Sequence, residues 1–101
     1  MTEWETVAPG IRRRIQMDGK AIMLVEVHFE ANTLAARHSH PHEQITYVLK
    51  GRMKFTRDQE VIWVKAGESI HMPSNVPHEA ASLEESVLLD VFSPPREDFR
   101  K

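Results

Sequence analysis

Three of the six histidines in this chain fall within five residues, which makes this segment a candidate metal-binding site. His38 and His40 are separated by one serine, and Gln44 follows after three further residues. Residues of equal parity in a strand point to the same face, so these side chains would project together from an extended segment. Two neighbouring imidazoles on one face are suitable ligands for a divalent ion. The spacing therefore predicts a metal site built from this segment.

A further ligand can come from much later in the chain. His78 stands at the end of the segment PSNVPH, which can turn back towards the first pair. The other histidines are expected to have structural roles, because a lone histidine in an apolar run is usually a hydrogen-bonded core residue. We expect His28 and His71 to be such core residues, and His42 to lie on a turn.

An acidic residue lies within the last apolar run, SVLLDVFSPPRED. Asp90 shares the parity of Phe92, and a carboxylate in such a strand costs free energy unless it is paired, hydrogen-bonded or hydrated. Arg96 follows two prolines that restrict its approach. Two interpretations stay open. Asp90 and Arg96 form a structural ion pair that closes one end of the fold, or they line the mouth of a pocket together with Phe92.

Short β-branched and apolar runs separated by turn residues must position these side chains. The expected strands are 11–17, 21–29, 34–40, 44–49, 52–57, 61–65, 69–72, 77–82 and 87–92. The dipeptide Asp18-Gly19 predicts a hairpin in which both turn residues take positive φ. Only 96–101 is expected to form a terminal turn. Nine short strands with recurrent turns predict an all-β sandwich or barrel with negligible helix.

Length, charge and cysteine content exclude several classes of protein. With 101 residues the chain has room for one core but not for a separate dinucleotide-binding or (β/α)₈ domain. Thirteen basic and fifteen acidic residues leave no surplus for nucleic acid, and no apolar span of about 20 residues is present for a membrane. The absence of cysteine excludes disulfides and thiolate ligands and fits a reducing compartment. We expect one cytoplasmic domain over residues 1–101, without a signal peptide.

Two segments resemble the two motifs of the cupin family, one over about 33–51 and the other over about 67–82. The residues that keep the family's spacing are the four candidate ligands, two glycines and a proline: His38, His40, Gln44, Gly51, Gly67, Pro73 and His78. The resemblance implies a double-stranded β-helix, which is a jelly-roll barrel, and a single cupin domain over the whole chain.

The chain departs from the cupin pattern at four positions. Glycine is replaced by asparagine at Asn32 or its neighbour and at Asn75. Glutamate is replaced by Gln44, and asparagine is replaced by Ser82. Asparagine is tolerable at a glycine position because it also enters the left-handed region. The change at Gln44 alters the chemistry, since a neutral ligand leaves a divalent ion its full charge. Such an ion attracts anionic oxygens more strongly, which favours Lewis-acid chemistry over a dioxygenase.

Within the cupins, the segment HSHPHEQ together with the pattern D-x-F-x₃-R at 90–96 resembles the small pectin-degradation cupins that linearise unsaturated uronates. That resemblance implies one divalent metal ion, which could be Ni, Zn, Fe or Mn. It assigns the ion four ligands: His38, His40, Gln44 and His78. It also implies ring opening and ketonisation of a small anionic sugar, a 4,5-unsaturated uronate monosaccharide.

The residues near the C-terminus would act on that substrate. Asp90 would move the proton, Phe92 would form a wall against the sugar ring, and Arg96 would hold the carboxylate. We also expect a homodimer, because a short barrel leaves an edge strand and apolar surface, with Trp4 and Trp63 as candidates. Three alternatives stay open: a metal-dependent oxygenase, a non-catalytic sugar- or effector-binding cupin, and a barrel with a purely structural metal.

Overall fold

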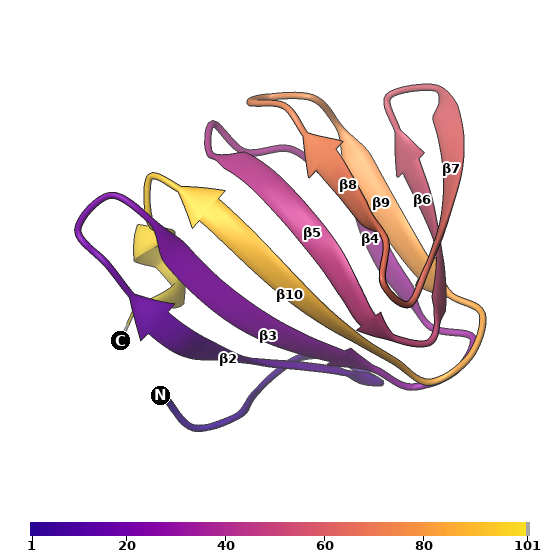
Figure 1. Cartoon of the computed structure of the whole chain (residues 1–101), viewed down its shortest axis with the longest axis horizontal. Helices are drawn as coiled ribbons and strands as arrows, with labels where there is room; N and C mark the ends of the chain where they lie inside the picture. Colours follow the sequence, from indigo (N-terminus) through magenta and orange to yellow (C-terminus); the bar gives the residue numbers. More distant parts are fainter. Residues whose placement is uncertain (101) are drawn as a thin grey trace.

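The computed structural model describes residues 1–100, which form ten strands in two sheets (Figure 1). The larger sheet contains six strands: Glu5–Ala8 (β1), Ile11–Asp18 (β2), Met23–Phe29 (β3), Glu43–Lys50 (β5), Ser69–Met72 (β8) and Ser86–Ser93 (β10). The smaller sheet contains four: Leu34–His38 (β4), Arg52–Arg57 (β6), Glu60–Lys65 (β7) and His78–Ser82 (β9). The sheets lie face to face around one apolar core, which confirms the predicted all-β class.

All pairings within the sheets are antiparallel. The strand orders are β1-β2-β3-β10-β5-β8 and β4-β9-β6-β7, so strands distant in sequence lie side by side in both sheets. The helical content of residues 1–100 is one 3₁₀ turn, Glu97–Phe99 (η1). It lies within the predicted terminal turn 96–101, of which residue 101 is outside the described residues. Within the same residues, no helix has the length and hydropathy to cross a bilayer.

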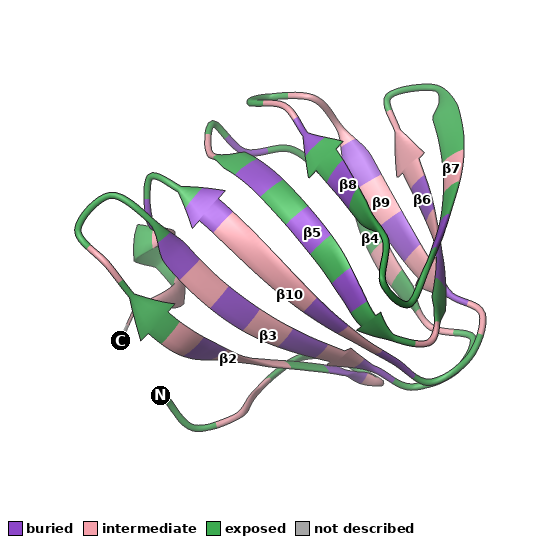
Figure 2. Ribbon diagram, viewed as in Figure 1, coloured by how far each residue is buried: buried purple, intermediate pink, exposed green. Residues whose placement is uncertain are grey.

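Alternating side chains place the core between the sheets. Along β5, exposed and buried residues alternate as far as Val48, and β3 alternates buried with half-buried residues (Figure 2). The inward side chains of β5 are Gln44, Thr46 and Val48, none of which is more than 7% exposed. Since this sequence changes from polar to apolar along the strand, the interior is polar at the end where β5 begins.

The predicted strands omit β1 and overextend β4. β1 is short and half polar, but it is joined to β2 through Pro9-Gly10, and Gly10 has a φ of 80°. Proline followed by glycine at positive φ is typical of a type II turn, so this signal could have identified the hairpin. β4 ends at His38, and His40 lies in the connection to β5 rather than in the predicted strand 34–40.

The hairpin between β2 and β3 forms, but its predicted turn is wrong. Asp18 is the last residue of β2 and pairs with Met23. Residues 19–22 make the connection, in which the Gly19 N–H donates to the Ile22 carbonyl at 2.8 Å. Neither Asp18 nor Gly19 takes a positive φ. A four-residue connection does not require the backbone twist of a two-residue turn, so the Asp-Gly rule does not apply here.

The residues that depart from the cupin pattern have local structural explanations. Asn32 and Asn75 have φ values of 56° and 63°, which confirms that asparagine takes the left-handed conformation at these positions. Ser82 is buried, and its hydroxyl donates to the Glu30 carbonyl at 2.5 Å and accepts from the Thr33 N–H at 3.0 Å. The Ser82 side chain therefore hydrogen-bonds the end of β9 to the connection between β3 and β4.

Candidate metal centre

Three histidines meet at the end of the barrel where β4 pairs with β9. His38 is the last residue of β4, and its register partner is His78, the first residue of β9. His40 lies two residues beyond β4, and the ring centroids of the three histidines are 4.5, 5.0 and 5.7 Å apart. One ligand nitrogen from each ring lies within 4.8 Å of the others. These residues could therefore hold one metal ion together.

Main-chain carbonyl groups fix the tautomer of all three rings. The Nδ1 atoms of His38, His40 and His78 each lie 2.9 to 3.0 Å from a carbonyl oxygen two residues away. Because a carbonyl oxygen can only accept, the hydrogen of each neutral ring is on Nδ1, and Nε2 carries a lone pair. Metal-ligating histidines commonly have this arrangement, in which the second nitrogen donates to a carbonyl or carboxylate.

The Nε2 lone pairs of two of these rings lack a hydrogen-bond donor. Nε2 of His78 is buried without a partner among residues 1–100, and Nε2 of His40 lies 2.9 Å from the amide oxygen Oε1 of Gln44. Burial lowers the pKa of both rings, and that of His78 falls to about 4, so protonation does not supply the missing hydrogen at neutral pH. A cation would satisfy the facing lone pairs. The donor set therefore fits a divalent metal ion.

A chain of hydrogen bonds connects Gln44 to Asp90. Nε2 of Gln44 donates to Oγ1 of Thr46 at 2.8 Å, and Oγ1 of Thr46 donates to Oδ1 of Asp90 at 2.6 Å. The chain directs the amide oxygen of Gln44 towards His40. Thr46 was not among the predicted site residues. Its parity with Gln44 is the signal that could have drawn attention to it.

Asp90 and Phe92 enter the site from β10, next to β5 in the larger sheet. Their register partners on β5 are Thr46 and Gln44 respectively. Burial raises the pKa of Asp90 to about 6, against the opposing effect of the hydrogen bond from Thr46. Phe92 is 2% exposed, and its ring packs edge-on against His40 with centroids 5.7 Å apart. Phe92 thus supports the histidine cluster.

Arg96 forms its ion pair with Asp98, two residues further along. Nε and Nη2 donate to the two carboxylate oxygens of Asp98 at 3.0 and 2.8 Å. The guanidinium carbon lies 5.0 Å from the ring centroid of Phe92 and 4.2 Å from that of Phe99. Within the part of the chain that the structure describes, no salt bridge joins Arg96 to Asp90, so the proposed structural ion pair between them is wrong. Asp98 was not among the predicted site residues.

A cavity of about 410 Å³ brings these groups together, and its size is within the usual range for small-molecule sites of about 300–1,000 Å³. His38, Gln44, His78, Asp90 and Arg96 contribute to its walls. Most of the remaining wall is apolar and comes from both sheets. Imidazole nitrogens, a carboxyl group and a guanidinium group therefore line one cavity.

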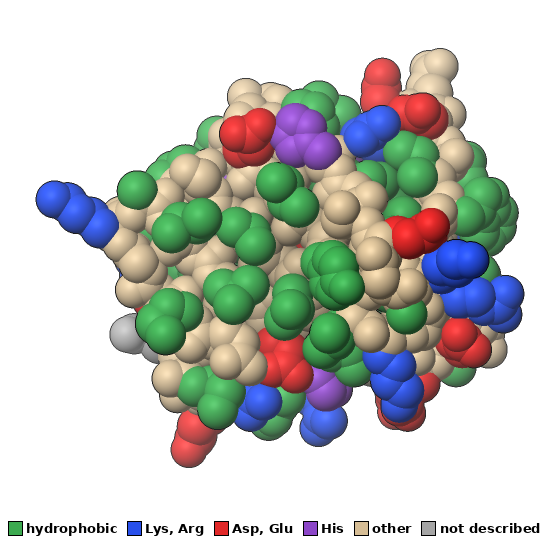
Figure 3. Space-filling view, in the orientation of Figure 1, with side chains coloured by type: hydrophobic (Ala, Val, Ile, Leu, Met, Phe, Trp, Pro, Cys, Tyr) green, Lys and Arg blue, Asp and Glu red, His purple; other side chains and the backbone are tan. Residues whose placement is uncertain are grey.

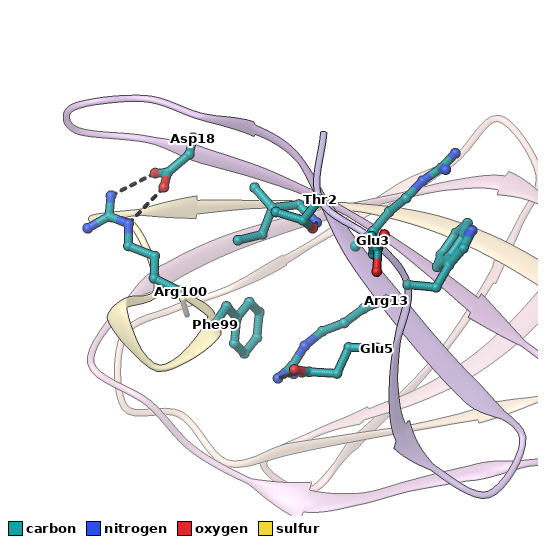
Figure 4. A pocket seen from close by; sticks show the side chains of 10 residues that line it. Thr2, Glu3, Glu5, Arg13, Asp18, Phe99 and Arg100 are labelled. Atoms are coloured by element: carbon teal, nitrogen blue, oxygen red, sulfur yellow. Dashed lines mark hydrogen bonds and ion pairs between the residues drawn. The ribbon is translucent and has the colours of Figure 1, made fainter.

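A second cavity of about 490 Å³ lies between the N-terminal segment, β2 and η1 (Figure 4). Four of its charged side chains form ion pairs with one another. Arg13 binds Glu5 at 2.7 Å, and Arg100 binds Asp18 at 2.6 Å. Among the described residues its lining contains no histidine. The histidine-lined cavity is therefore the better candidate for chemistry.

The other three histidines are not part of this group of three, although the ring of His42 packs edge-on against that of His40 with centroids 5.6 Å apart. His28 bonds to Glu26 and His71 bonds to Glu43, each at 2.7 Å, so both are hydrogen-bonded as predicted. Neither is a core residue, because each occupies an outward position of its strand; His28 is half-buried and His71 is exposed. His42 lies in the connection between β4 and β5, as predicted for a turn residue.

Comparison with known proteins is consistent across sequence and structure. The model of the cupin domain family matches residues 25–92. The chain is 39% identical over 100 residues to the pectin degradation protein KdgF of Dickeya dadantii (strain 3937), covering 97% of this chain and 91% of the relative. KdgF from Halomonas sp. superposes with a TM-score of 0.91 at 33% identity, covering 96% and 90% of the two chains. An RmlC-like cupin from Shewanella frigidimarina NCIMB 400 gives the same TM-score and identity, covering 97% and 88%.

Proposed function

This chain belongs to the cupin family, and from that membership we propose that it is a metal-dependent enzyme that opens and ketonises a 4,5-unsaturated uronate monosaccharide. Similarity to two KdgF proteins supports a role in pectin degradation. The observation that carries the chemistry is one cavity shared by unsatisfied imidazole nitrogen, the Asp90 carboxyl group and Arg96. We propose that residues 1–101 form one domain. We also propose a cytoplasmic location, because a chain without cysteine is compatible with a reducing compartment.

The proposed metal ligands are His38, His40, Gln44 and His78, around one divalent ion of Ni, Zn, Fe or Mn. When bound, such an ion polarises a substrate oxygen as a Lewis acid. None of the four ligands is a carboxylate, so the ion keeps its positive charge and the site favours an anionic sugar. Imidazole nitrogen suits several of these metals equally, which leaves the choice of ion to direct measurement.

Asp90 is proposed to move the proton. The reaction is an isomerisation in which the anomeric hydroxyl loses a proton and the C1–O5 bond breaks. An aldehyde forms at C1, and the proton lost from the anomeric hydroxyl is balanced by one gained at O5, which gives an enol at C5. A proton is then added at C4 while the enol hydroxyl loses its proton, which gives the ketone. A carboxyl group with a pKa of about 6 can both accept and donate a proton near neutral pH. Asp90 lines the cavity, so its carboxyl group would contact a substrate bound there.

Arg96 is proposed to bind the substrate carboxylate. Asp98 occupies Nε and Nη2, and within residues 1–100 no hydrogen bond reaches Nη1. The side chain is 11% exposed and lines the cavity, so a guanidinium nitrogen remains for an anion inside the barrel. Phe92 is proposed as the wall next to this group.

Metal analysis combined with an ultraviolet assay tests this function. Ketonisation after ring opening removes the conjugated C4=C5 bond, so absorbance falls as product forms. The purified chain should contain about one equivalent of a divalent metal and accelerate the loss of absorbance. Replacement of His40 by Ala should abolish both while the β-sheet circular dichroism is kept. Undiminished turnover in that variant would contradict a metal-dependent reaction.

The same preparation separates the alternatives. Turnover that requires O₂ would identify an oxygenase. Binding of galacturonate without conversion of the unsaturated uronate would identify a sugar- or effector-binding cupin. A bound metal with neither binding nor turnover would identify a structural site.

We also propose a homodimer that forms through the outer face of the larger sheet. Hydrophobic side chains gather over β3, β5 and β10 on this face (Figure 3). The exposed members that define the outer apolar face are Met17, Ile22, Ile45, Tyr47 and Leu49, which are 40–69% exposed. Five large side chains exposed to this degree provide roughly 500 Å² of accessible surface, which is more than half of the roughly 800 Å² that each partner buries in a stable interface. Two copies of the same apolar face can pair about a two-fold axis, which makes a second copy the proposed partner.

The expected tryptophan contacts need revision. Trp4 is half-buried, and its ring packs against His28 and Arg14, so little of it is available to a partner. Trp63 is 62% exposed but lies on β7 in the smaller sheet. Light scattering on Tyr47→Glu should report a monomer, whereas the matched control Trp63→Ser should remain dimeric. Dissociation by Trp63→Ser alone would place the interface on the other sheet, and a monomeric wild type would contradict the dimer.

A further inference from the structure

Thr46 is a completely buried polar residue that lies between Gln44, a proposed metal ligand, and Asp90, the proposed proton carrier. Its exposure is 0%, and its hydroxyl contacts Gln44 at 2.8 Å and Asp90 at 2.6 Å. A hydroxyl costs free energy to bury, and Val48, the next inward residue of the same strand, shows that valine is accommodated on this face. The position of the hydroxyl thus calls for an explanation beyond packing.

We propose that Thr46 is a positioning residue that fixes which end of the Gln44 amide faces the histidines. A hydroxyl group has a single hydrogen, and that of Thr46 is donated to Asp90. Thr46 can then only accept from Gln44, so the NH₂ end of the amide faces Thr46 and the oxygen end faces His40. Rotation of the amide by a half-turn would bring its oxygen against the hydroxyl lone pairs. It would also present N–H hydrogens, which cannot ligate a cation, to the imidazole nitrogens.

The need for such a partner follows from the replacement of glutamate by glutamine. A carboxylate presents an oxygen in either orientation, whereas an amide can ligate a metal through only one of its two ends. A glutamine ligand therefore requires an orienting group that a glutamate ligand does not. The Thr46 hydroxyl meets this requirement and connects the ligand to the carboxyl group of Asp90.

This inference rests on the proposed role of Gln44 as a metal ligand, and its test measures metal affinity rather than turnover. The Zn²⁺ affinity of the full chain is determined by competition with a chromophoric chelator. Thr46→Val keeps the shape of the side chain and loses both hydrogen bonds, whereas Thr46→Ser retains the hydroxyl. We expect Thr46→Val to weaken Zn²⁺ binding by about tenfold and Thr46→Ser to stay within about threefold of wild type, because outer hydrogen-bond partners of ligands typically contribute about 10- to 100-fold.

A double-mutant cycle shows whether Thr46 acts through Gln44. In a Gln44→Ala background the amide is absent, so adding Thr46→Val should not change Zn²⁺ affinity further. Ser82→Ala is the matched control, because it removes another buried hydroxyl that bonds only to main-chain groups. It should leave Zn²⁺ affinity unchanged. Should Thr46→Val fail to fold by circular dichroism, Thr46→Ala provides the same loss of hydrogen bonds.

The outcomes separate this inference from the proposed function. Equal losses in Thr46→Val and Ser82→Ala would overturn the inference, as would a loss that serine does not rescue. A full effect of Thr46→Val in the Gln44→Ala background would also overturn it, since the hydroxyl would then act by another route. If Gln44→Ala alone leaves Zn²⁺ affinity unchanged, Gln44 is not a ligand and the proposed ligand set is itself wrong.

Discussion

His38 and His78 are register partners across the β4–β9 pair, and their rings lie 4.5 Å apart between centroids. Main-chain pairing of the two strands therefore positions two nitrogen ligands from segments far apart in the sequence. The site is built into the smaller sheet, while β5 and β10 of the larger sheet supply Gln44 and Asp90 from the facing side. A metal held between them would link the two sheets at one end of the barrel.

Metal removal should lower the thermal stability of the wild type. A ligand that binds only the folded state stabilises it by mass action, by about 2.7 kcal/mol at a free concentration a hundred times the dissociation constant. Melting followed by circular dichroism should show a lower Tm after treatment with a chelator. The His40→Ala variant should melt at the same temperature with and without chelator. A chelator-insensitive wild type would indicate that no stabilising metal is bound.

Gln44→Glu should retain metal and weaken the binding of anions. A carboxylate oxygen ligates divalent ions as well as an amide oxygen, but it lowers the net charge of the site by one. We expect a higher KM for the unsaturated uronate and weaker binding of galacturonate by calorimetry. Galactose, which lacks the carboxylate, is the control ligand and should bind the two proteins alike. Equal galacturonate affinity would mean that the neutral ligand has no electrostatic role.

The stability of Asp90→Asn relative to wild type should depend on pH. The pKa of Asp90 is raised from 3.8 to about 6 in the folded state, so folding favours its protonated form. The stability that this protonation contributes is present below about pH 4 and is lost as pH rises through 6. In chelator-treated protein, urea unfolding should therefore shift in favour of the variant by up to about 3 kcal/mol between pH 4 and 7. His78, whose pKa is lowered to about 4, affects both proteins alike and cancels in the difference.

A difference in unfolding free energy that does not change with pH would contradict the raised pKa. Thr46→Val provides a second check, because the hydrogen bond from Thr46 lowers the pKa of Asp90. When chains with and without Asp90→Asn are compared in a Thr46→Val background, the pH-dependent change in unfolding free energy should occur at higher pH.

Asp98→Ala should raise KM with little change in kcat. Asp98 holds Arg96 through two hydrogen bonds, and freeing a long side chain adds an entropy cost to binding. We expect KM to rise roughly threefold to tenfold, as for one side chain that must be ordered on binding. Glu97→Gln removes the same charge from the neighbouring residue, which pairs with Arg100 instead, and should leave KM unchanged. Equal effects of the two substitutions would show that only the net charge matters.

Strand periodicity is sufficient to identify the inner face of β5, because Gln44, Thr46 and Val48 follow the parity that starts with His38 and His40. Parity does not specify which strands become neighbours. The register of His38 with His78 depends on the pairing of β4 with β9, which no local pattern encodes. The error at His71 has a different cause, because its apolar neighbours suggested a core position although the alternation along β8 places it on the outer face.

The partner of Arg96 could not be chosen from the sequence for a related reason. Three acidic residues, Asp90, Glu97 and Asp98, lie within six positions of Arg96. The turn η1 brings Asp98 to the guanidinium group, whereas Glu97 faces Arg100. Short turns at the end of a chain depend on tertiary contacts, here the packing of Phe99 against Phe92 with ring centroids 5.6 Å apart.

Turnover of the unsaturated uronate by metal-loaded Asp90→Asn, compared with wild type of equal metal content, tests the proposed reaction most directly. Asparagine keeps the shape of the side chain but cannot move a proton. The account predicts that the loss of ultraviolet absorbance slows by about 10²–10⁴-fold, the usual contribution of a positioned acid or base, while metal content is unchanged. Turnover equal to wild type at the same metal content would contradict it.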